Sequence, residues 1–444
     1  MNKKRHAQQL QNLVQQGIAL HQGGKLAEAE QRYRSVLKLQ PNNADALHFL
    51  GLLLHRLGKP ADAITSVRQA TVHAPEYVDA FNNLGNLLKL AGKFDEAEAA
   101  YRRSIALRPA DANAHSNLGV VLKARGLLSE AEATLRKAIE LDDRHVPAYT
   151  NLGHLLKRTG RMEEAISYYR AAIVFDPENP AAPHVLGLAY QANGEMENAR
   201  GVFQAWLDRD PGNPVAMHML QACSESAAPA RASDAYVRTI FDDMADNFDE
   251  HLADLGYRAP QIIAEAVAHI WPQPNSELSI LDAGCGTGLC GHFLRPLAST
   301  LTGIDLSSGM LRRAQALKLY DQLIEAELTA FLEAHSQTYD AVISADTLCY
   351  FGALDAMFGA TAQALRPGGY LLFTVEKAPA SAGYGYHLQS HGRYSHAPEY
   401  VRRELENAGF HVKALNDAEL RMESGKPVQG LVVTAHHTDR KSVV

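Results

Sequence analysis

The chain has 444 residues, a hydrophobic content of 46%, a charged content of 21% and a formal net charge of −7 at neutral pH. This length predicts two to four domains, and the negative charge excludes nucleic-acid binding driven by overall charge. No run approaches the roughly 18 apolar residues that a membrane span needs. The basic amino terminus is followed by glutamines and lacks the apolar stretch of a signal peptide. We therefore expect a cytoplasmic protein that binds neither nucleic acid nor membrane.

The four cysteines, Cys223, Cys285, Cys290 and Cys349, form no C-x-x-C pair and belong to no cluster of metal-ligand residues. Such thiols are typical of a reduced, intracellular setting. We expect no metal site.

The first half of the chain repeats with a period of 34 residues. Each period holds a glycine, an alanine twelve residues later, a large apolar residue four residues after the alanine, and a proline or aspartate eight residues after that. The glycines are Gly17, Gly51, Gly85, Gly119, Gly153 and Gly187, and the apolar residues are Tyr33, Val67, Tyr101, Leu135, Tyr169 and Phe203. This pattern resembles six tetratricopeptide repeats over about 10–213, in which paired helices cross at small residues and proline ends the second helix. A single repeat cannot bury its apolar face, so the repeats must stack. Residues 214–223 follow as a capping helix.

A second ladder with the same period lies in the first helices of the middle repeats. It consists of Asn83, Asn117 and Asn151, and of Lys89, Lys123 and Lys157. The repeats resemble those of the O-linked N-acetylglucosamine transferase kind, where such asparagines hold the backbone of an extended peptide. An amide offers both a donor and an acceptor, and lysines favour an acidic peptide. The alternative is that the asparagines bond only to neighbouring helices and the lysines form a solvated face.

Residues 224–234 are small and polar, and we expect them to link a repeat domain over 1–223 to a second domain over 235–437, with a tail over 438–444. The second domain opens with aromatic and acidic residues at helical spacing over 236–252. This F-D-x-x-A segment resembles the mobile lid of some methyltransferases, and packing of an amphipathic helix on a sheet is a compatible alternative.

The most informative motif lies within residues 279–309. A short apolar strand enters the turn L-D-A-G-C-G-T-G, a helix follows, and a second apolar strand ends at Asp305. The glycines let a ligand approach the backbone, and an acid after the second strand can accept both hydroxyls of a ribose. The residues from Gly286 to Gly291 also match a dinucleotide fingerprint, so NAD is an alternative ligand. Asp282, just before the turn, would repel a pyrophosphate but accept from an ammonium group.

Together with the turn L-R-P-G-G over 365–369, these motifs resemble a class I S-adenosylmethionine-dependent methyltransferase. The resemblance implies a Rossmann-like α/β domain with a seven-stranded, mostly parallel sheet after the all-α repeat superhelix. It implies S-adenosylmethionine as the cofactor, bound by Asp282, Gly284, Cys285, Gly286, Gly288, Asp305, Leu306, Glu327, Leu328 and Asp346. Glu327 would accept from the adenine amine, or is a solvated acid at a strand end. Asp346 would hold the α-ammonium of the cofactor, or caps the next helix.

The methyl acceptor should bind beyond the carboxyl ends of the strands, where ligands bind in open α/β sheets. Residues 346–351, Glu376 and an insertion over 384–396 that is rich in histidine and tyrosine are expected there. Because histidine exchanges protons near neutral pH, we predict His387 and Tyr394 as catalytic residues. A metal site at the histidines lacks an acid or cysteine to complete it, and an ordinary surface loop is the alternative.

Two functions follow from these expectations. In the first, the repeats bind a protein or peptide that the second domain methylates. In the second, the domain methylates a small molecule and the repeats only hold a protein partner. A non-enzymatic adaptor is disfavoured by the intact glycine turn with Asp282 and Asp305.

Overall fold

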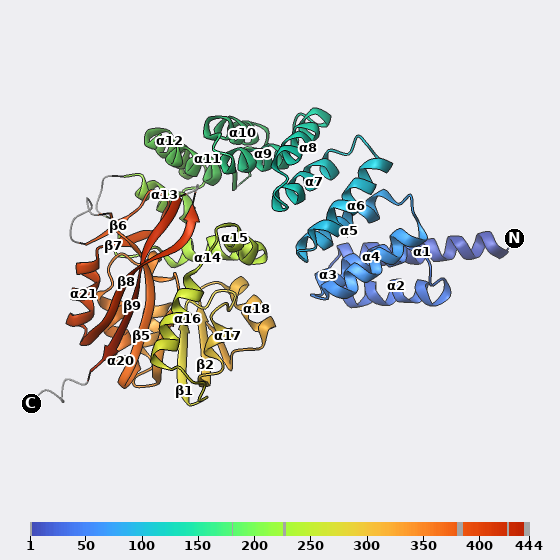
Figure 1. Ribbon diagram of the computed structural model, residues 1–444. Coiled ribbons are helices and arrows are strands. Elements are labelled where there is room, and N and C mark those ends of the chain that lie inside the picture. Colours follow the sequence, from blue (N-terminus) through green and yellow to red (C-terminus); the bar gives the residue numbers. More distant parts are fainter. Residues whose placement is uncertain (1, 180, 225–227, 380–384, 424–425, 439–444) are drawn as a thin grey trace, which may run out of the picture. The chain divides into compact units, whose positions relative to one another are not determined.

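The computed structural model describes residues 2–179, 181–224, 228–379, 385–423 and 426–438 (Figure 1). Residues 225–227 of the expected linker, Tyr384 of the insertion and residues 439–444 of the tail lie outside the described residues, as do 380–383. The chain divides into two compact units, Met1–Ala182 and Pro183–Val444.

The first unit is built from antiparallel helix pairs, as the 34-residue period predicts. Its helices are α1 (Asn2–Gln22), α2 (Leu26–Leu39), α3 (Ala44–Arg56), α4 (Pro60–His73), α5 (Val78–Leu90), α6 (Phe94–Leu107), α7 (Ala112–Ala124), α8 (Leu128–Leu141), α9 (Val146–Arg158) and α10 (Met162–Phe175). The sixth predicted pair, α11 (Ala181–Ala192) and α12 (Met196–Arg209), and the capping helix α13 (Pro214–Ala222) fall mainly or wholly in the second unit.

The conserved spacing of glycine and large apolar residue has a steric cause. In the fifth repeat a Cβ at Gly153 would lie 2.4 Å from a ring carbon of Tyr169, and a Cβ at Gly187 in the sixth would lie 2.1 Å from Phe203. The two helices of a repeat therefore approach so closely that only glycine fits under the apolar side chain. Tyr169 is buried, and its hydroxyl lies 3.0 Å from His154 Nδ1.

We expect Gly153→Ala to lower the free energy of unfolding by about 1–2 kcal/mol, because overpacking costs roughly 1–3 kcal/mol and the gain in helix propensity returns about 0.5–1. Gly201→Ala in α12 is the matched control, since a Cβ there meets nothing within 4 Å. The control should be neutral or stabilising. Urea unfolding followed by circular dichroism measures both, and equal stability of the two variants would contradict the close approach.

The last helices of the repeat pattern pack with the residues that follow them. His218 of α13 lies 2.8 Å through Nε2 from the carbonyl oxygen of Gly392, and its ring stacks on Tyr236 with centroids 3.9 Å apart. These contacts explain why the compact units divide near residue 182. The boundary at 224–234 was predicted from the sequence pattern and falls inside the second unit.

The remaining helices of the second unit surround a sheet. They are α14 (Asp234–Met244), α15 (Phe248–Asp254), α16 (Ala259–Ile270), α17 (Gly291–Leu294), α18 (Ser308–Leu317), α19 (Leu328–Glu333), α20 (Asp355–Ala364) and α21 (Pro398–Asn407), with 3-10 turns η1 (Ala245–Asn247) and η2 (Leu348–Tyr350). The strands are β1 (Leu278–Ala283), β2 (Ala298–Asp305), β3 (Gln322–Glu325), β4 (Tyr339–Ser344), β5 (Leu365–Lys377), β6 (Tyr386–Leu388), β7 (Tyr394–His396), β8 (Phe410–Glu423) and β9 (Lys426–His437).

The sheet confirms the predicted fold class and adds to it. Strands β3, β2, β1, β4 and β5 are parallel in that order, and β9 and β8 continue the sheet antiparallel beyond β5. The prediction of seven strands is corrected to nine among the described residues, because the insertion after β5 forms the hairpin β6–β7. Strand β7 pairs with the end of β5 at Glu376 and Lys377.

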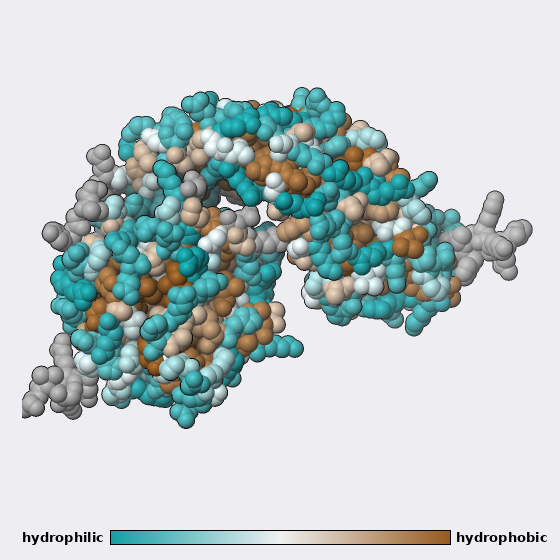
Figure 2. Space-filling view, in the orientation of Figure 1, coloured by the Kyte–Doolittle hydropathy of each residue, from teal (hydrophilic) through white to brown (hydrophobic). Residues whose placement is uncertain are grey.

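Two hydrophobic cores cover the two faces of the sheet. One joins the sheet to α19, α20 and α21, with Phe358 and Phe373 at its centre, and the other joins it to α16 and α17. Figure 2 shows mostly hydrophilic residues on the visible surface, with hydrophobic residues in small groups between them, as expected when the large apolar side chains are inside. Within the described ranges, no helix combines the length and the hydropathy that crossing a bilayer requires.

Candidate functional site

A cavity of about 300 Å³ lies beyond the carboxyl ends of β1, β2 and β4. The helices α14 and α15 form one wall of it, through apolar residues such as Ile240, Phe241, Met244 and Phe248. Eight of the ten residues predicted to bind the cofactor line this cavity: Gly284, Cys285, Gly286, Asp305, Leu306, Glu327, Leu328 and Asp346. Residues of the sequence motifs therefore line one cavity, although they lie at the carboxyl ends of four different strands.

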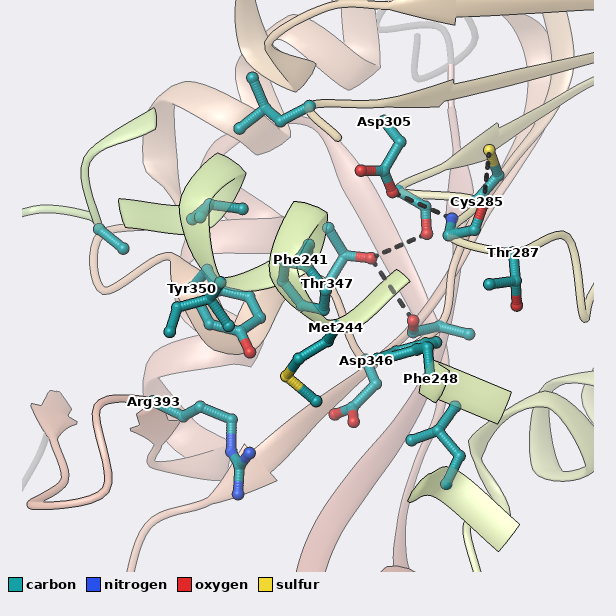
Figure 3. A pocket seen from close by; sticks show the side chains of 18 of the residues that line it. Phe241, Met244, Phe248, Cys285, Thr287, Asp305, Asp346, Thr347, Tyr350 and Arg393 are labelled. Atoms are coloured by element: carbon teal, nitrogen blue, oxygen red, sulfur yellow. Dashed lines mark hydrogen bonds between the residues drawn. The ribbon is translucent and has the colours of Figure 1, made fainter. Parts of the chain in front are cut away.

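The glycine turn after β1 presses closely on the loop after β4. Gly284 has a φ of +75°, and a Cβ there would lie 2.1 Å from the hydroxyl oxygen of Thr347. Asp305 closes the turn from the other side, because its carboxylate accepts the backbone N–H of Gly286 at 3.0 Å and that of Ser307 at 2.8 Å. Burial raises the pKa of Asp305, and these backbone donors oppose the rise. The turn is thus a fixed cradle with an acid at its rim (Figure 3).

Glu327 lies at the start of α19, and only one of its two carboxylate oxygens accepts a hydrogen bond from the helix. Its Oε2 accepts the backbone N–H of Ala330 at 2.8 Å and caps the helix. Its Oε1 is buried and has no protein hydrogen-bond donor within the described part of the chain. A buried acceptor without a donor is costly, so this atom suits a ligand N–H.

Asp282 and Gly288 do not line the cavity, and the contact of Asp282 with a ligand ammonium stays a prediction. The Asp282 carboxylate accepts the hydroxyl of Tyr320 at 2.6 Å and is buried. Burial raises the pKa of Asp282 to about 7, and the charge of Asp305 adds to the rise while the bond from Tyr320 opposes it. Gly288 packs against Leu317 and Tyr320, where a Cβ would come within 3.0–3.1 Å. Both residues therefore support the glycine turn without lining the cavity.

The segment predicted as a lid both packs on the domain and lines the cavity. Asp249 of α15 accepts the hydroxyl of Thr287, in the glycine turn, at 2.6 Å. Asp242 of α14 accepts the Ser307 hydroxyl at 2.6 Å and the Gly309 backbone N–H at 3.0 Å. The acids of this segment therefore tie it to the two loops that hold the predicted cofactor residues.

Five charged side chains form a buried network at the other end of the cavity: Asp346, Glu376, Arg393, Arg421 and Glu423, which we call the charge cluster. Arg421 donates to Asp346 at 2.9 Å, to Glu423 at 2.8 Å and also to Glu376. Arg393 donates to Glu376 at 2.7 Å and to Glu423. Burial opposes ionisation of Glu376, but Arg393 and Arg421 outweigh it and lower its pKa. Such a network tolerates the loss of one member poorly, since a buried charge would be left uncompensated.

The predicted catalytic residues His387 and Tyr394 lie outside the lining of the cavity. The reason is the hairpin: they belong to its strands β6 and β7, whereas its turn supplies the lining residues His391 and Arg393. Tyr394 is fully buried and its hydroxyl donates to the carbonyl of Pro229 at 3.0 Å. His391 Nε2 lies 3.6 Å from Glu376 Oε2.

The predicted peptide-binding residues lie on α5, α7 and α9, the first helices of their repeats. Asn83 donates through Nδ2 to His48 Nε2 at 2.9 Å, and Asn151 donates to the Ser116 hydroxyl at 3.4 Å. Both partners belong to the preceding repeat, as the alternative of bonds to neighbouring helices requires. Asn117, Lys89, Lys123 and Lys157 are half-buried. The carbonyl oxygen of each bonded amide remains an acceptor for a further donor.

Among the described residues, no group of three or more histidine, cysteine, aspartate or glutamate side chains is arranged to hold a metal ion. The four cysteines are free and buried.

Comparison with known proteins agrees with both halves of the chain. Residues 255–415 match the sequence profile described as a methyltransferase domain, residues 17–58 match that of the TPR repeat, and residues 81–207 match the middle TPR-like domain of cilia and flagella-associated protein 70. The repeat part is similar to the crystal structure of MamA, at 28% sequence identity and a TM-score of 0.34, over 36% of this chain and 95% of that chain.

Two curated relatives match the second half. Methyltransferase-like protein 27 from Homo sapiens is 32% identical over 173 residues, which are 38% of this chain and 66% of that protein. A malonyl-[acyl-carrier protein] O-methyltransferase from Priestia megaterium is 30% identical over 166 residues, which are 36% of this chain and 56% of that protein. The chain thus spans less than two thirds of the length of these relatives. The sequence matches together identify tetratricopeptide repeats in the first part of the chain and a methyltransferase domain in the second.

Proposed function

We propose that the chain transfers the methyl group of S-adenosylmethionine to a small molecule held in the cavity beside α14 and α15, while the repeats bind a protein or peptide. The observation that carries the proposal is the joint lining of one cavity by the cofactor residues, the apolar face of α14–α15 and the charge cluster. When bound, the cofactor supplies an activated methyl group on a positively charged sulfur. The protein then mainly positions the reactants.

The residues present fit the cofactor. Asp305 at the rim of the glycine turn would accept the ribose hydroxyls. Glu327 Oε1, buried and without a donor, would accept the adenine amine, with Leu306 and Leu328 on either side. The glycine turn leaves room for the backbone to approach the ligand, which a Cβ would prevent.

We infer a small acceptor because hydrogen bonds hold the α14–α15 segment, which forms one wall of the cavity, in place. Asp249 and Asp242 tie the α14–α15 segment to the two cofactor loops with hydrogen bonds of 2.6 Å. The apolar side chains that this segment presents to the cavity favour a small apolar acceptor beside the cofactor.

The repeats are proposed to bind a protein or peptide partner, as tetratricopeptide repeats generally do. The Asn83, Asn117 and Asn151 ladder would contribute its remaining amide groups and the lysines would favour acidic segments. Bonds of Asn83 and Asn151 to the preceding repeat fix the orientation of these amides. Methylation of the captured protein itself is the competing possibility, and the product of the reaction separates the two.

We expect S-adenosylmethionine to bind the full chain and NAD not to bind. The physical reason is that the buried carboxylate of Asp282 lies directly before the glycine turn, where its charge would repel a pyrophosphate. Calorimetric titration with each ligand measures this. Binding of NAD with no binding of S-adenosylmethionine would overturn the assignment of the cofactor.

A further inference from the structure

We propose that the methyl acceptor is a hydroxyl compound with an apolar body, and that Asp346 accepts the proton of its hydroxyl group while Arg393 and Tyr350 bind its oxygen. This inference rests on the proposed function and names the class of acceptor for the same site.

Asp346 is held in an unusual conformation that points to a function. It lies two residues beyond β4 with a φ of +56°, in the left-handed region that aspartate visits at a cost. Its backbone N–H donates to the Thr374 hydroxyl at 2.8 Å, and its Oδ2 accepts from Arg421 at 2.9 Å. The side chain does not cap the following turn η2, which lacks a side-chain cap. Thr374 of β5 thus fixes the backbone of Asp346, and Arg421 of β8 orients its carboxylate.

The second oxygen of this carboxylate is unused. Asp346 Oδ1 is buried and, in the described part of the chain, accepts no hydrogen bond from the protein. Burial raises the pKa of Asp346, Arg421 opposes the rise, and Glu376 adds to it. A carboxylate with a raised pKa and a free, buried oxygen is suited to accept a proton from a neutral donor.

Two donors complete the same part of the cavity. Figure 3 shows the side chains of Asp346, Tyr350 and Arg393 around one space, with Met244 of α14 at its side. Arg393 uses Nε and Nη2 within the charge cluster. Its Nη1 and the Tyr350 hydroxyl donate to no acceptor among the described residues. A group that donates to Asp346 and accepts from Arg393 and Tyr350 matches all three.

A hydroxyl group is the chemistry that meets these conditions. A carboxylate would accept from Arg393 but would be repelled by Asp346 and by Glu376 and Glu423 behind it, which leave the charge cluster with one more acid than base. A methyl ether could not donate to Asp346. The apolar side chains of Phe241, Met244 and Leu255 around this space favour an apolar body on the acceptor.

The methyl transfer needs no reactant other than the hydroxyl compound and the cofactor, with Asp346 as the proton acceptor. The hydroxyl oxygen forms the new bond to the methyl carbon as the carbon–sulfur bond breaks, with its electron pair left on sulfur. The hydroxyl proton passes to Asp346 Oδ1, and Arg393 stabilises the negative charge that develops on the oxygen. The products are a methyl ether, an uncharged thioether and a protonated Asp346 that returns its proton to water.

The N–H or O–H donor to Asp346 could instead be the α-ammonium of the cofactor. The test therefore measures two affinities on Asp346→Asn, which keeps the shape of the side chain. The first is the affinity for S-adenosylhomocysteine, which carries the same ammonium. The second is the affinity of the S-adenosylhomocysteine complex for 4-propylphenol, with 4-propylanisole and 4-propylbenzoate as matched probes. The control variant is Asp417→Asn, an exposed acid that pairs with Lys377 and does not line the cavity.

We expect wild type and Asp417→Asn to bind the phenol at least about tenfold more tightly than the anisole and the benzoate, the effect of one hydrogen bond to a charged group. Asp346→Asn should lose this preference and keep its affinity for S-adenosylhomocysteine within about twofold. A tenfold loss of S-adenosylhomocysteine affinity would assign Asp346 to the ammonium and overturn the proposal. A wild type that binds S-adenosylhomocysteine but prefers the benzoate, or binds none of the probes, would also overturn it. Failure of wild type to bind S-adenosylhomocysteine would instead contradict the proposed function.

Discussion

Asp305→Ala is expected to weaken the binding of S-adenosylmethionine by about 1.5–3 kcal/mol, roughly 10- to 150-fold, because charge-assisted hydrogen bonds to the ribose are lost. The variant also removes the acceptor for the backbone N–H groups of Gly286 and Ser307, so the cradle itself loosens. Calorimetric titration measures the affinity, and circular dichroism checks the fold.

Glu325→Ala is the matched control for this experiment. Glu325 ends β3 directly opposite Asp305 in the parallel register, yet it lies outside the lining of the cavity. Its 3.7 Å pairing with Arg238 is between half-exposed side chains and is worth about 0–1 kcal/mol. The control should keep wild-type affinity within about twofold. An unchanged affinity in a folded Asp305→Ala protein would remove Asp305 from the cofactor site.

Gly284→Ala is expected to lower the free energy of unfolding by about 2–5 kcal/mol, from a left-handed φ that costs about 1–2 and overpacking that costs about 1–3. The added Cβ would lie 2.1 Å from the hydroxyl oxygen of Thr347 and 2.4 Å from its methyl carbon. Because the turn can relieve the contact only by moving, cofactor binding should be lost as well. Urea unfolding and calorimetry measure the two effects.

Gly286→Ala separates steric contact from backbone strain. Gly286 also has a positive φ, +54°, but a Cβ there meets nothing within 4 Å. It should therefore show only the strain of about 1–2 kcal/mol. The double variant Gly284→Ala with Thr347→Ala should recover part of the lost stability. If Gly284→Ala is no less stable than Gly286→Ala, the close approach of the two loops is not the reason for glycine at 284.

The repeat pattern was predictable because it follows from local periodicity, and the Rossmann-like fold class was predictable from the resemblance of its motifs. Glycine and a large apolar residue sixteen positions apart meet in each repeat since two helices and a turn separate them by a fixed geometry. The hairpin β6–β7 was not predicted, because its strands are three residues long and carry no alternation that a sequence pattern could detect. The register with the end of β5 arises only in the folded sheet.

The cavity residues proposed to bind the cofactor were predictable from motifs, whereas those at the proposed acceptor end were not. Asp305 and Glu327 follow strands at positions that a motif marks. Arg421, in contrast, meets Asp346 across 75 residues of sequence and sits in a strand where nothing local distinguishes it. The insertion was predicted to contribute to this region, and His391 and Arg393 in its turn line the cavity, whereas His387 and Tyr394 in its strands do not. Asp282 is the opposite case, because this acid belongs to a motif and yet accepts a hydrogen bond from Tyr320.

The central claim, methyl transfer to a small molecule, is tested most directly by following a labelled methyl group. The full chain is incubated with S-adenosylmethionine labelled in its methyl group and a cell extract from which endogenous cofactor has been removed. The products are then separated into precipitable protein and small molecules. We expect enzyme-dependent label in the small-molecule fraction, reduced at least tenfold by Asp305→Ala at a cofactor concentration below saturation and unchanged by Glu325→Ala. Label confined to precipitable protein would contradict the small-molecule acceptor, and no enzyme-dependent label in either fraction would contradict methyl transfer itself.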